Sequence, residues 1–382
     1  MSLAVMRVRR WRPVLEREWL LVFSLGFWLV SSVYVGHFPG YSTNEFQVLF
    51  ILFVLFVVTT GLKNSGVFDY VARRVEQGRH VALKMVLLTF LLSMWVTNDV
   101  ALLIVVPLTV RLRVRNKVWL VALETLAANV GSALTPFGNP QNLFIYWLYG
   151  VTPGAFVASI APFVGGALVF LVFAALLLKM PPAAEKAEGQ AWNPQGTVYM
   201  VLLVLFVLVS LHLLPLYAGL LPILYVLLFD RPSLDVDYGL LATFFCLFGL
   251  TDNLSQVFAA QLHRTDHVFL TAVILSQVLS NVPTTLILVH HVSRWQVLLW
   301  GVNVGGFGTL IASLANVIAY RIYATEADDG AWAFLSKFSL LSGGFLVLGV
   351  VLYYVVGPGR GGIHLQEFFR ICLAGLQVLS LP

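Results

Sequence analysis

Apolar runs separated by short charged segments fill almost the whole chain. The first run extends from Trp19 to Gly36 and the second from Glu45 to Leu62. A run of about twenty apolar residues is long enough to cross the hydrocarbon core of a bilayer as a helix. Further full spans are predicted over 154–178, 197–214, 216–229, 238–250 and 332–356. The pattern predicts an all-α polytopic membrane protein, with about nine transmembrane helices once the two discontinuous helices below are counted.

One apolar run has the same charge at both ends. Met85 to Val110 follows Lys84 and precedes the basic segment 111–117, and basic loops mark the cytoplasmic side. Its 26 residues are too few for two crossings. We therefore predict a re-entrant hairpin over about 85–110 that turns at Thr97-Asn98-Asp99, because those polar groups need a protein-lined cavity. A second hairpin is predicted over 268–292, turning at Ser280-Asn281.

Two other long apolar segments contain breaks. In the segment of about 118–149, Pro136 and Pro140 each remove a backbone donor, and Gly138 relaxes the chain between them. The segment of about 295–323 is interrupted near Gly308. Both are predicted to be discontinuous helices.

The first break has a partner in the second half of the chain. The run 129–142 aligns without a gap with 303–316, and five of the fourteen positions are identical. Thr97-Asn98 precedes the first run, as Ser280-Asn281 precedes the second. Two polar signatures in the same order indicate an internal duplication, and a single linking span between the copies inverts the second. The predicted division is repeat 1 over 1–179, a linker and linking helix over 180–214, repeat 2 over 215–356 and an interfacial tail over 357–382.

Composition supports a membrane location and changes the meaning of the positive charge. The chain is 59% hydrophobic and 11% charged, whereas a soluble domain is about a quarter charged. Its net charge of +5 comes from basic residues clustered between apolar runs, a positive-inside pattern and not a nucleic-acid patch. Five arginines precede Trp19, so we predict a multi-pass protein of the cytoplasmic (inner) membrane with a cytoplasmic N-terminus, embedded in the lipid bilayer, without a nucleic-acid partner.

The predicted architecture places polar side chains at one central site. Half-helices that begin at the breaks point N–H groups at an anion, and half-helices that end there offer carbonyls to a cation. Amide and hydroxyl side chains can hold an oxyanion or a neutral oxyacid without a buried arginine. The predicted substrate-binding residues are Asn98, Thr135, Asn139, Asn142, Ser280, Asn281, Thr284, Asn303, Thr309 and Asn316.

Asp99 is the residue that most directly suggests ion coupling. An acid at membrane depth costs at least about 2.5 kcal/mol, so it is a coupling-ion ligand or proton carrier unless it is capped internally. The predicted coupling-ion residues are Thr97, Asn98, Asp99, Glu124, Gly131 and Gly305, with sodium at Thr97, Asn98 and Gly138. For the glycines, close helix packing remains the alternative. No cofactor is expected beyond H⁺ or Na⁺ as coupling ion.

These motifs resemble those of the ion transporter superfamily. Residues 97–107 are similar to the first hairpin of arsenite permeases and NhaD-type sodium/proton antiporters, 134–142 to the broken-helix motif of the wider family, and 280–285 to the second hairpin. The resemblance is to citrate-transporter-like and arsenite-permease-like members, related to divalent anion symporters. It implies an elevator-type secondary active transporter that forms a homodimer. Divalent anion symporters have Ser-Asn-Thr at both tips, whereas this chain has Thr-Asn-Asp at the first and Ser-Asn-Val at the second. The additional acid, Asp99, favours proton or cation coupling, and arsenite or another oxyanion is then a plausible substrate.

The sequence therefore predicts a secondary active transporter of a small anion or oxyacid, coupled to a proton or sodium gradient. A sodium/proton antiporter is the alternative, and a passive channel stays open. The chain has no ATP-binding motif, so ATP would act only through a separate ATPase partner. It is not expected to be an enzyme, because it has no His-Glu-x-x-His helix and no Ser with a His at membrane depth.

Overall fold

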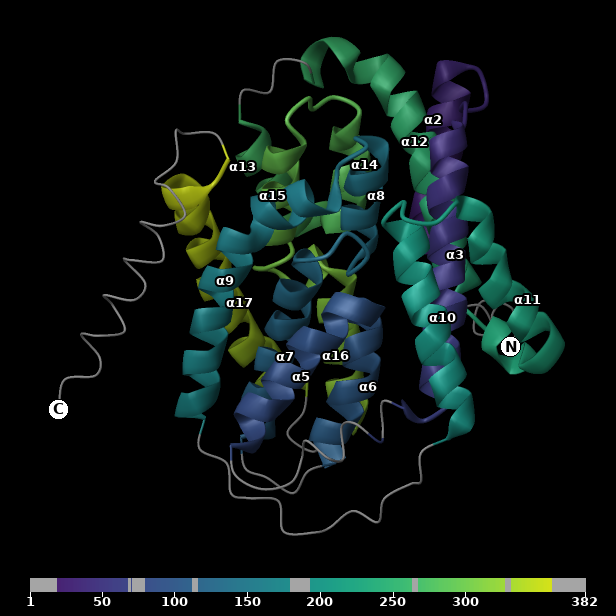
Figure 1. Cartoon of the computed structure of the whole chain (residues 1–382). Coiled ribbons are helices and arrows are strands. Elements are labelled where there is room, and N and C mark those ends of the chain that lie inside the picture. The colour runs from purple at the N-terminus through teal and green to yellow at the C-terminus, as the bar shows by residue number, and fades with distance from the viewer. Residues whose placement is uncertain are drawn as a thin grey trace, which may run out of the picture.

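The fold is all-helical, as predicted (Figure 1). A computed structural model describes residues 19–67, 70, 80–111, 116–178, 193–262, 267–326 and 331–358. Within these ranges it contains fifteen α-helices and the three short 3-10 helices η1 (Leu216–Gly219), η2 (Arg231–Leu234) and η3 (Leu310–Ala312). The predicted cytoplasmic N-terminus, the linker up to residue 192 and the tail from residue 359 lie outside the described residues.

Five helices form one side of the bundle, which we call the first helix group. They are α2 (Trp19–Val35), α3 (Thr43–Asn64), α10 (Pro194–Ser210), α11 (Leu220–Phe229) and α12 (Tyr238–Leu262). Helix α2 packs along α12, and α10 and α11 pack on α3. Figure 1 shows these helices together on the right of the view.

The other ten described helices form the second helix group. They are α5 (Val81–Val96), α6 (Asn98–Arg111), α7 (Lys117–Ala133), α8 (Pro140–Leu148), α9 (Pro153–Leu177), α13 (Val268–Leu279), α14 (Asn281–Val289), α15 (Trp295–Gly305), α16 (Leu314–Glu326) and α17 (Ala331–Val356). Helix α6 packs on α16, α7 on α17, and α8 on α14. The two halves of the sequence are therefore interleaved within this group.

Each of the two predicted hairpins turns at the expected tip. Helices α5 and α6 meet at Thr97, whose φ is 91°, and α13 and α14 meet at Ser280, whose φ is 75°. A side-chain-bearing residue with positive φ is strained by about 1–3 kcal/mol, and such strain gathers at functional sites. Both turns use the same unusual conformation at corresponding positions.

The two segments that were predicted to be discontinuous helices are each divided into two helices in the structure. Helix α7 ends at Ala133, and α8 begins at Pro140, with the Asn139 side chain accepting a hydrogen bond from the Asn142 N–H at 2.9 Å. Proline suits the first turn of a helix because its missing N–H has no partner there anyway. In the second segment, α15 ends at Gly305 and α16 begins at Leu314, with η3 between them.

One helix is longer than predicted. Helix α12 continues past the expected end at Leu250 to Leu262. Two of the polar residues that suggested an end donate hydrogen bonds: Thr251 Oγ1 to the Leu247 carbonyl, and Asn253 Nδ2 to the hydroxyl of Ser32 on α2, while Asn253 Oδ1 has no partner among the described residues. The hydropathy pattern does not reveal a neighbouring helix that supplies such partners.

Helix length alone does not account for all the predicted crossings. Among the described helices, four segments are long and apolar enough to cross a membrane: Thr43–Asn64, Pro153–Leu177, Arg231–Asn253 and Ala331–Val356. Six more apolar helices are shorter, at 10–17 residues. The protein is a multi-pass membrane protein, while the number of full crossings stays a prediction.

We expect Gly131→Ala to lower the melting temperature, because Gly131 lies where α7 crosses α5. A Cβ there would lie 2.2 Å from the Phe90 carbonyl oxygen and 2.4 Å from Ser93 Oγ. Backbone cannot yield as a flexible side chain does, so overpacking of about 1–3 kcal/mol is expected. Thermal unfolding in detergent measures the effect, with Gly165→Ala on α9 as control, since nothing lies within 4 Å of a Cβ at that position. Equal melting temperatures for the two variants would contradict the packing role.

Candidate substrate and ion site

Asparagines from both halves of the chain meet between the interrupted helices. Asn129 Nδ2 donates to Asn316 Oδ1 at 2.8 Å, and Asn303 Nδ2 donates to Asn142 Oδ1 at 2.8 Å. In the aligned runs Asn129 corresponds to Asn303, and Asn142 to Asn316. The same hydrogen bond is therefore made twice, with the halves exchanging roles.

Two of these asparagines also cap the broken helices. Asn142 Nδ2 lies 3.1–3.2 Å from the carbonyl oxygens of Ser132, Ala133 and Thr135, where α7 ends. Asn316 Nδ2 does the same for two carbonyls after α15, at 3.0 and 3.3 Å. A broken helix leaves carbonyls without partners, and these amides satisfy them. Asn142 and Asn316 are thus engaged by the protein itself.

Asn98, at the first tip, is hydrogen-bonded to the same group of asparagines. Its Nδ2 donates to Asn129 Oδ1 at 3.1 Å, and its Oδ1 accepts the Asp99 N–H at 3.0 Å. Its backbone N–H donates to the Gly138 carbonyl at 3.1 Å, so this carbonyl, predicted as a sodium ligand, already has one partner. Asn139 Nδ2 lies 3.3 Å from Asn303 Oδ1 and joins the network there.

Two of the predicted threonines, Thr135 and Thr309, connect the broken helices to the hairpins by hydrogen bonds. Thr135 Oγ1 donates to the Met94 carbonyl near the end of α5 at 2.8 Å, and Thr309 Oγ1 donates to the Gln277 carbonyl near the end of α13 at 3.0 Å. Neither threonine lines the cavities described next. Their contacts connect the broken helices to the hairpin tips.

A small cavity lies between the two tips. Asn98 and Asp99 line it from the first tip, and Ser280 and Asn281 from the second, with Gln141 of α8 beside them. Its volume is about 30 Å³, which is room for about one or two waters. Among the described residues, Asp99 is the only charged one that lines it.

A larger cavity of about 350 Å³ adjoins the small one, and we call it the vestibule. Asp99, Pro140, Leu240 and Leu314 line both spaces. Its wall also includes the ends of α3 and η2, so it lies between the two helix groups. A small molecule in the vestibule would reach the tips by passing Asp99.

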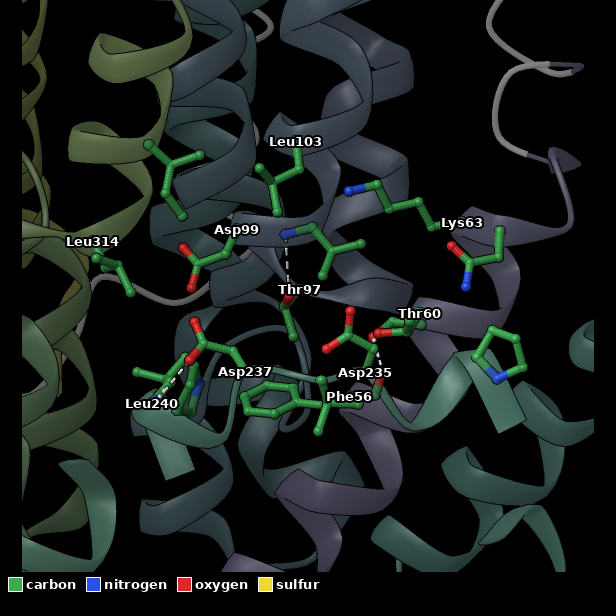
Figure 2. A pocket seen from close by; sticks show the side chains of 17 residues that line it. Phe56, Thr60, Lys63, Thr97, Asp99, Leu103, Asp235, Asp237, Leu240 and Leu314 are labelled. Carbon is green, nitrogen blue, oxygen red and sulfur yellow. Dashed lines mark hydrogen bonds between the residues drawn. The ribbon is translucent and has the colours of Figure 1, made fainter. Parts of the chain in front are cut away.

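The vestibule is acidic. Within the described part of the chain, Asp99, Asp235 and Asp237 line it together with one basic residue, Lys63 (Figure 2). Asp237 Oδ1 accepts the Leu240 N–H at 2.8 Å and so caps the start of α12. Figure 2 shows the carboxylates of Asp99 and Asp237 pointing toward one another, and the charge of Asp237 acts on Asp99. An excess of carboxylates favours entry of cations and neutral molecules over anions.

Asp99 has the features expected of a coupling residue. It lies at the start of α6, and its Oδ1 is buried without a hydrogen-bond partner among the described residues. No internal cap accounts for this oxygen. Because an unpaired buried acceptor is costly, a proton or cation on this carboxylate would be stabilising.

The remaining predicted residues lie elsewhere. Glu124 is fully buried and accepts the Thr109 hydroxyl at 2.5 Å, but it lines neither cavity. Gly131 and Gly305 lie at helix crossings, where a Cβ would meet α5 and α13 respectively. Thr284 is fully buried on α14, and its hydroxyl has no hydrogen-bond partner in the described part of the chain. Within the same part, no group of three or more His, Cys, Asp or Glu could hold a metal.

Four site residues were not among those predicted. Asn129 had a signal, because it matches Asn303 in the aligned runs. Gln141 has no counterpart there, since Ala315 occupies the aligned position. Asp235 and Asp237 precede an apolar span, where acids are common, and only the packing of α12 near the first tip brings them to the vestibule.

Interrupted helices that meet at a buried polar cavity are the architecture of membrane transporters. The chain belongs to the citrate transporter family of the ion transporter superfamily, because the CitMHS family profile, described as "Citrate transporter", matches residues 19–300. It is therefore a transporter and not an enzyme.

Three relatives are informative. The inner membrane protein YbiR of Escherichia coli is 37% identical over 297 residues, 73% of this chain and 80% of the relative. The uncharacterized transporter MJ0456 of Methanocaldococcus jannaschii is 30% identical over 353 residues, 87% and 93% of the two chains. The silicon efflux transporter LSI3 of rice is 34% identical over 131 residues, 32% of this chain and 27% of that protein.

Proposed function

We propose that this protein is a secondary active transporter that carries a small oxyacid or anion across the membrane, coupled to a proton or sodium gradient. The observation that carries the proposal is the cavity between the tips, lined by amides, hydroxyls and the carboxylate of Asp99. The polar side chains fit an oxygen-rich solute, and the unpartnered Asp99 Oδ1 fits a proton or cation.

The proposal includes two inverted repeats that work as an elevator. The equivalent strain at Thr97 and Ser280 and the exchanged asparagine bonds support the duplication. The division into two helix groups with the vestibule between them supports movement of the second group against the first. By analogy with elevator transporters, the protein would form a homodimer through the first group.

Orientation and location follow from the charge pattern and a relative. With the N-terminus in the cytoplasm, α3 ends on the cytoplasmic side at Lys63 and Asn64, which line the vestibule. The structure would then be open toward the cytoplasm. The name of the Escherichia coli relative supports the inner membrane.

The substrate is proposed to be smaller than the family name suggests. A central cavity of about 30 Å³ would have to widen far less for an oxyacid of four or five heavy atoms than for a tricarboxylate, and no described arginine or lysine lines it. The name of the rice relative refers to silicon, and dissolved silicon is present in water as an oxyacid. Arsenite-like or silicon oxyacids therefore fit better than citrate.

A sodium/proton antiporter is the second candidate, because an acidic vestibule ending at an unpartnered carboxylate would also suit a cation cycle without an oxyacid. Counterflow in proteoliposomes separates the two. Purified protein is loaded with one solute and offered labelled arsenite, silicic acid, phosphate, sulfate or a dicarboxylate, under imposed proton or sodium gradients.

We expect exchange of an oxyacid, and its uphill accumulation under one of the gradients. Accumulation also excludes a passive channel, which only equilibrates its solute. Movement of sodium and protons without any of the five solutes would replace the proposal with the antiporter.

A further inference from the structure

Gln141 is a buried amide whose hydrogen bonds are not made by the protein. Gln141 lies in the first turn of α8, and only 2% of its surface is exposed. Its side chain lines the cavity between the tips, and no residue of the described part forms a hydrogen bond with it. A glutamine amide has two donors and an acceptor. Because this amide faces the cavity and has no partner in the described part of the chain, its donors and acceptor are available to a molecule bound there.

The neighbouring groups limit what that molecule can be. Asn281 is 3% exposed and lines the same cavity, yet its Nδ2 donates to no described residue, and Asp99 Oδ1 accepts from none. The cavity thus offers free donors on two amides and free acceptors on Gln141 and Asp99. A molecule with hydroxyl groups satisfies both kinds at once, since each hydroxyl donates and accepts.

The charged residues around the two cavities favour a neutral molecule over its anion. An anion would have to pass Asp235 and Asp237 and then lie against Asp99, and Lys63 is the only basic residue that lines either cavity among those the structure describes. Like charges at contact in a site of low dielectric repel strongly. An uncharged molecule of the same shape meets no such barrier.

Another glutamine shows what a structural role looks like. Gln277, on α13, donates from Nε2 to the Gly305 and Phe307 carbonyls at 2.8 and 3.0 Å, and its Oε1 accepts the Thr309 N–H at 2.9 Å. It holds the break after α15 in place. Gln141 makes no bond of this kind, and the aligned position in the second half is Ala315.

We propose that Gln141 is a substrate-binding residue and that, with Asn281 and Asp99, it selects an uncharged, hydroxyl-bearing oxyacid over an anion. The inference rests on the proposed transport function and specifies its substrate class. Arsenous, boric and silicic acids, which are uncharged at neutral pH, are the compounds that fit this chemistry.

The test compares Gln141→Met with the matched variant Gln277→Met. Labelled arsenous acid uptake into proteoliposomes gives KM and kcat, and thermal unfolding gives the melting temperature. For Gln141→Met we expect KM to rise about tenfold, the effect of one lost hydrogen bond, with kcat and melting temperature unchanged. For Gln277→Met we expect a lower melting temperature, because its bonds to the backbone are lost. Gln141→Asn, which keeps the amide, should recover part of the affinity.

Selection is tested by competition at pH 7. Unlabelled boric and silicic acids should inhibit arsenous acid uptake by the wild type, whereas phosphate and sulfate should not. An unchanged KM in Gln141→Met, or stronger inhibition by phosphate than by the neutral acids, overturns the inference while leaving the proposed transport function intact. If the wild type moves neither oxyacids nor anions, it is the proposed function that fails.

Discussion

Asp99→Asn is expected to abolish gradient-driven accumulation of substrate while preserving exchange. Asparagine has the shape of aspartate and keeps one oxygen in place, but it cannot take up a proton or balance a cation. Substrate would still bind at the tips, because the asparagine oxygen remains as an acceptor and Gln141, Asn281 and Ser280 are unchanged, but discrimination against anions should weaken. Without coupling, a transporter only equilibrates its solute, so the accumulation ratio should fall to about one. Uptake under imposed gradients and counterflow without a gradient measure the two activities separately.

Asp237→Asn is the matched control for this prediction. Asp237 lines the same vestibule and faces Asp99, but one of its oxygens caps α12 through the Leu240 N–H. Asparagine caps a helix as well as aspartate does, so the fold should be kept. We expect accumulation to persist in Asp237→Asn, with a changed dependence on salt because the vestibule loses one negative charge. Equal loss of accumulation in both variants would show that vestibule charge matters and not Asp99 in particular.

The helix breaks could be predicted because their causes are local. Pro140 begins α8 and Gly308 has a φ of 100°, so both interruptions follow from residues at the break itself. The turns at Thr97 and Ser280 were indicated by polar residues inside apolar runs too short for two crossings. Burial of such residues in a membrane protein requires a special environment, and that requirement is visible in one dimension.

The partners of the site residues could not be predicted in the same way. The aligned runs show that Asn142 and Asn316 correspond, but not that each bonds to a member of the other half. Asp237 and Asp99 line the same vestibule because α12, which packs on α3 and α14, begins beside it, and nothing in the pattern of residues 231–240 carries that information. Gln141 is the second residue of α8, and the role proposed for it is supported by its position in the cavity and the absence of a partner in the described part of the chain, neither of which the sequence reveals.

Asn142→Leu is expected to destabilise the protein more than any other change at the site. Leucine has the same branching at Cγ but no donor or acceptor, so the carbonyls at the end of α7 lose their shared partner, and Asn303 Nδ2 loses its acceptor at 2.8 Å. Each unsatisfied buried group costs about 1–3 kcal/mol, and several are created at once. A total of about 3 kcal/mol or more is a large fraction of the stability of most folded proteins. Thermal unfolding and the yield of monodisperse protein in detergent measure the loss.

Asn281→Leu provides the control, since this asparagine is equally buried but its Nδ2 donates to no described residue. We expect Asn281→Leu to fold with a nearly unchanged melting temperature and to lose substrate affinity. The two variants thus separate the amides that hold the broken helices from the amides that face the cavity. If Asn142→Leu kept its melting temperature, the carbonyls at the end of α7 would have to find other partners. The hydrogen bonds between asparagines of the two halves would then not be needed for the stability of the fold. If Asn281→Leu unfolded instead, its amide would belong to the structural set, and the cavity would rely on Gln141 and Asp99 for substrate contacts.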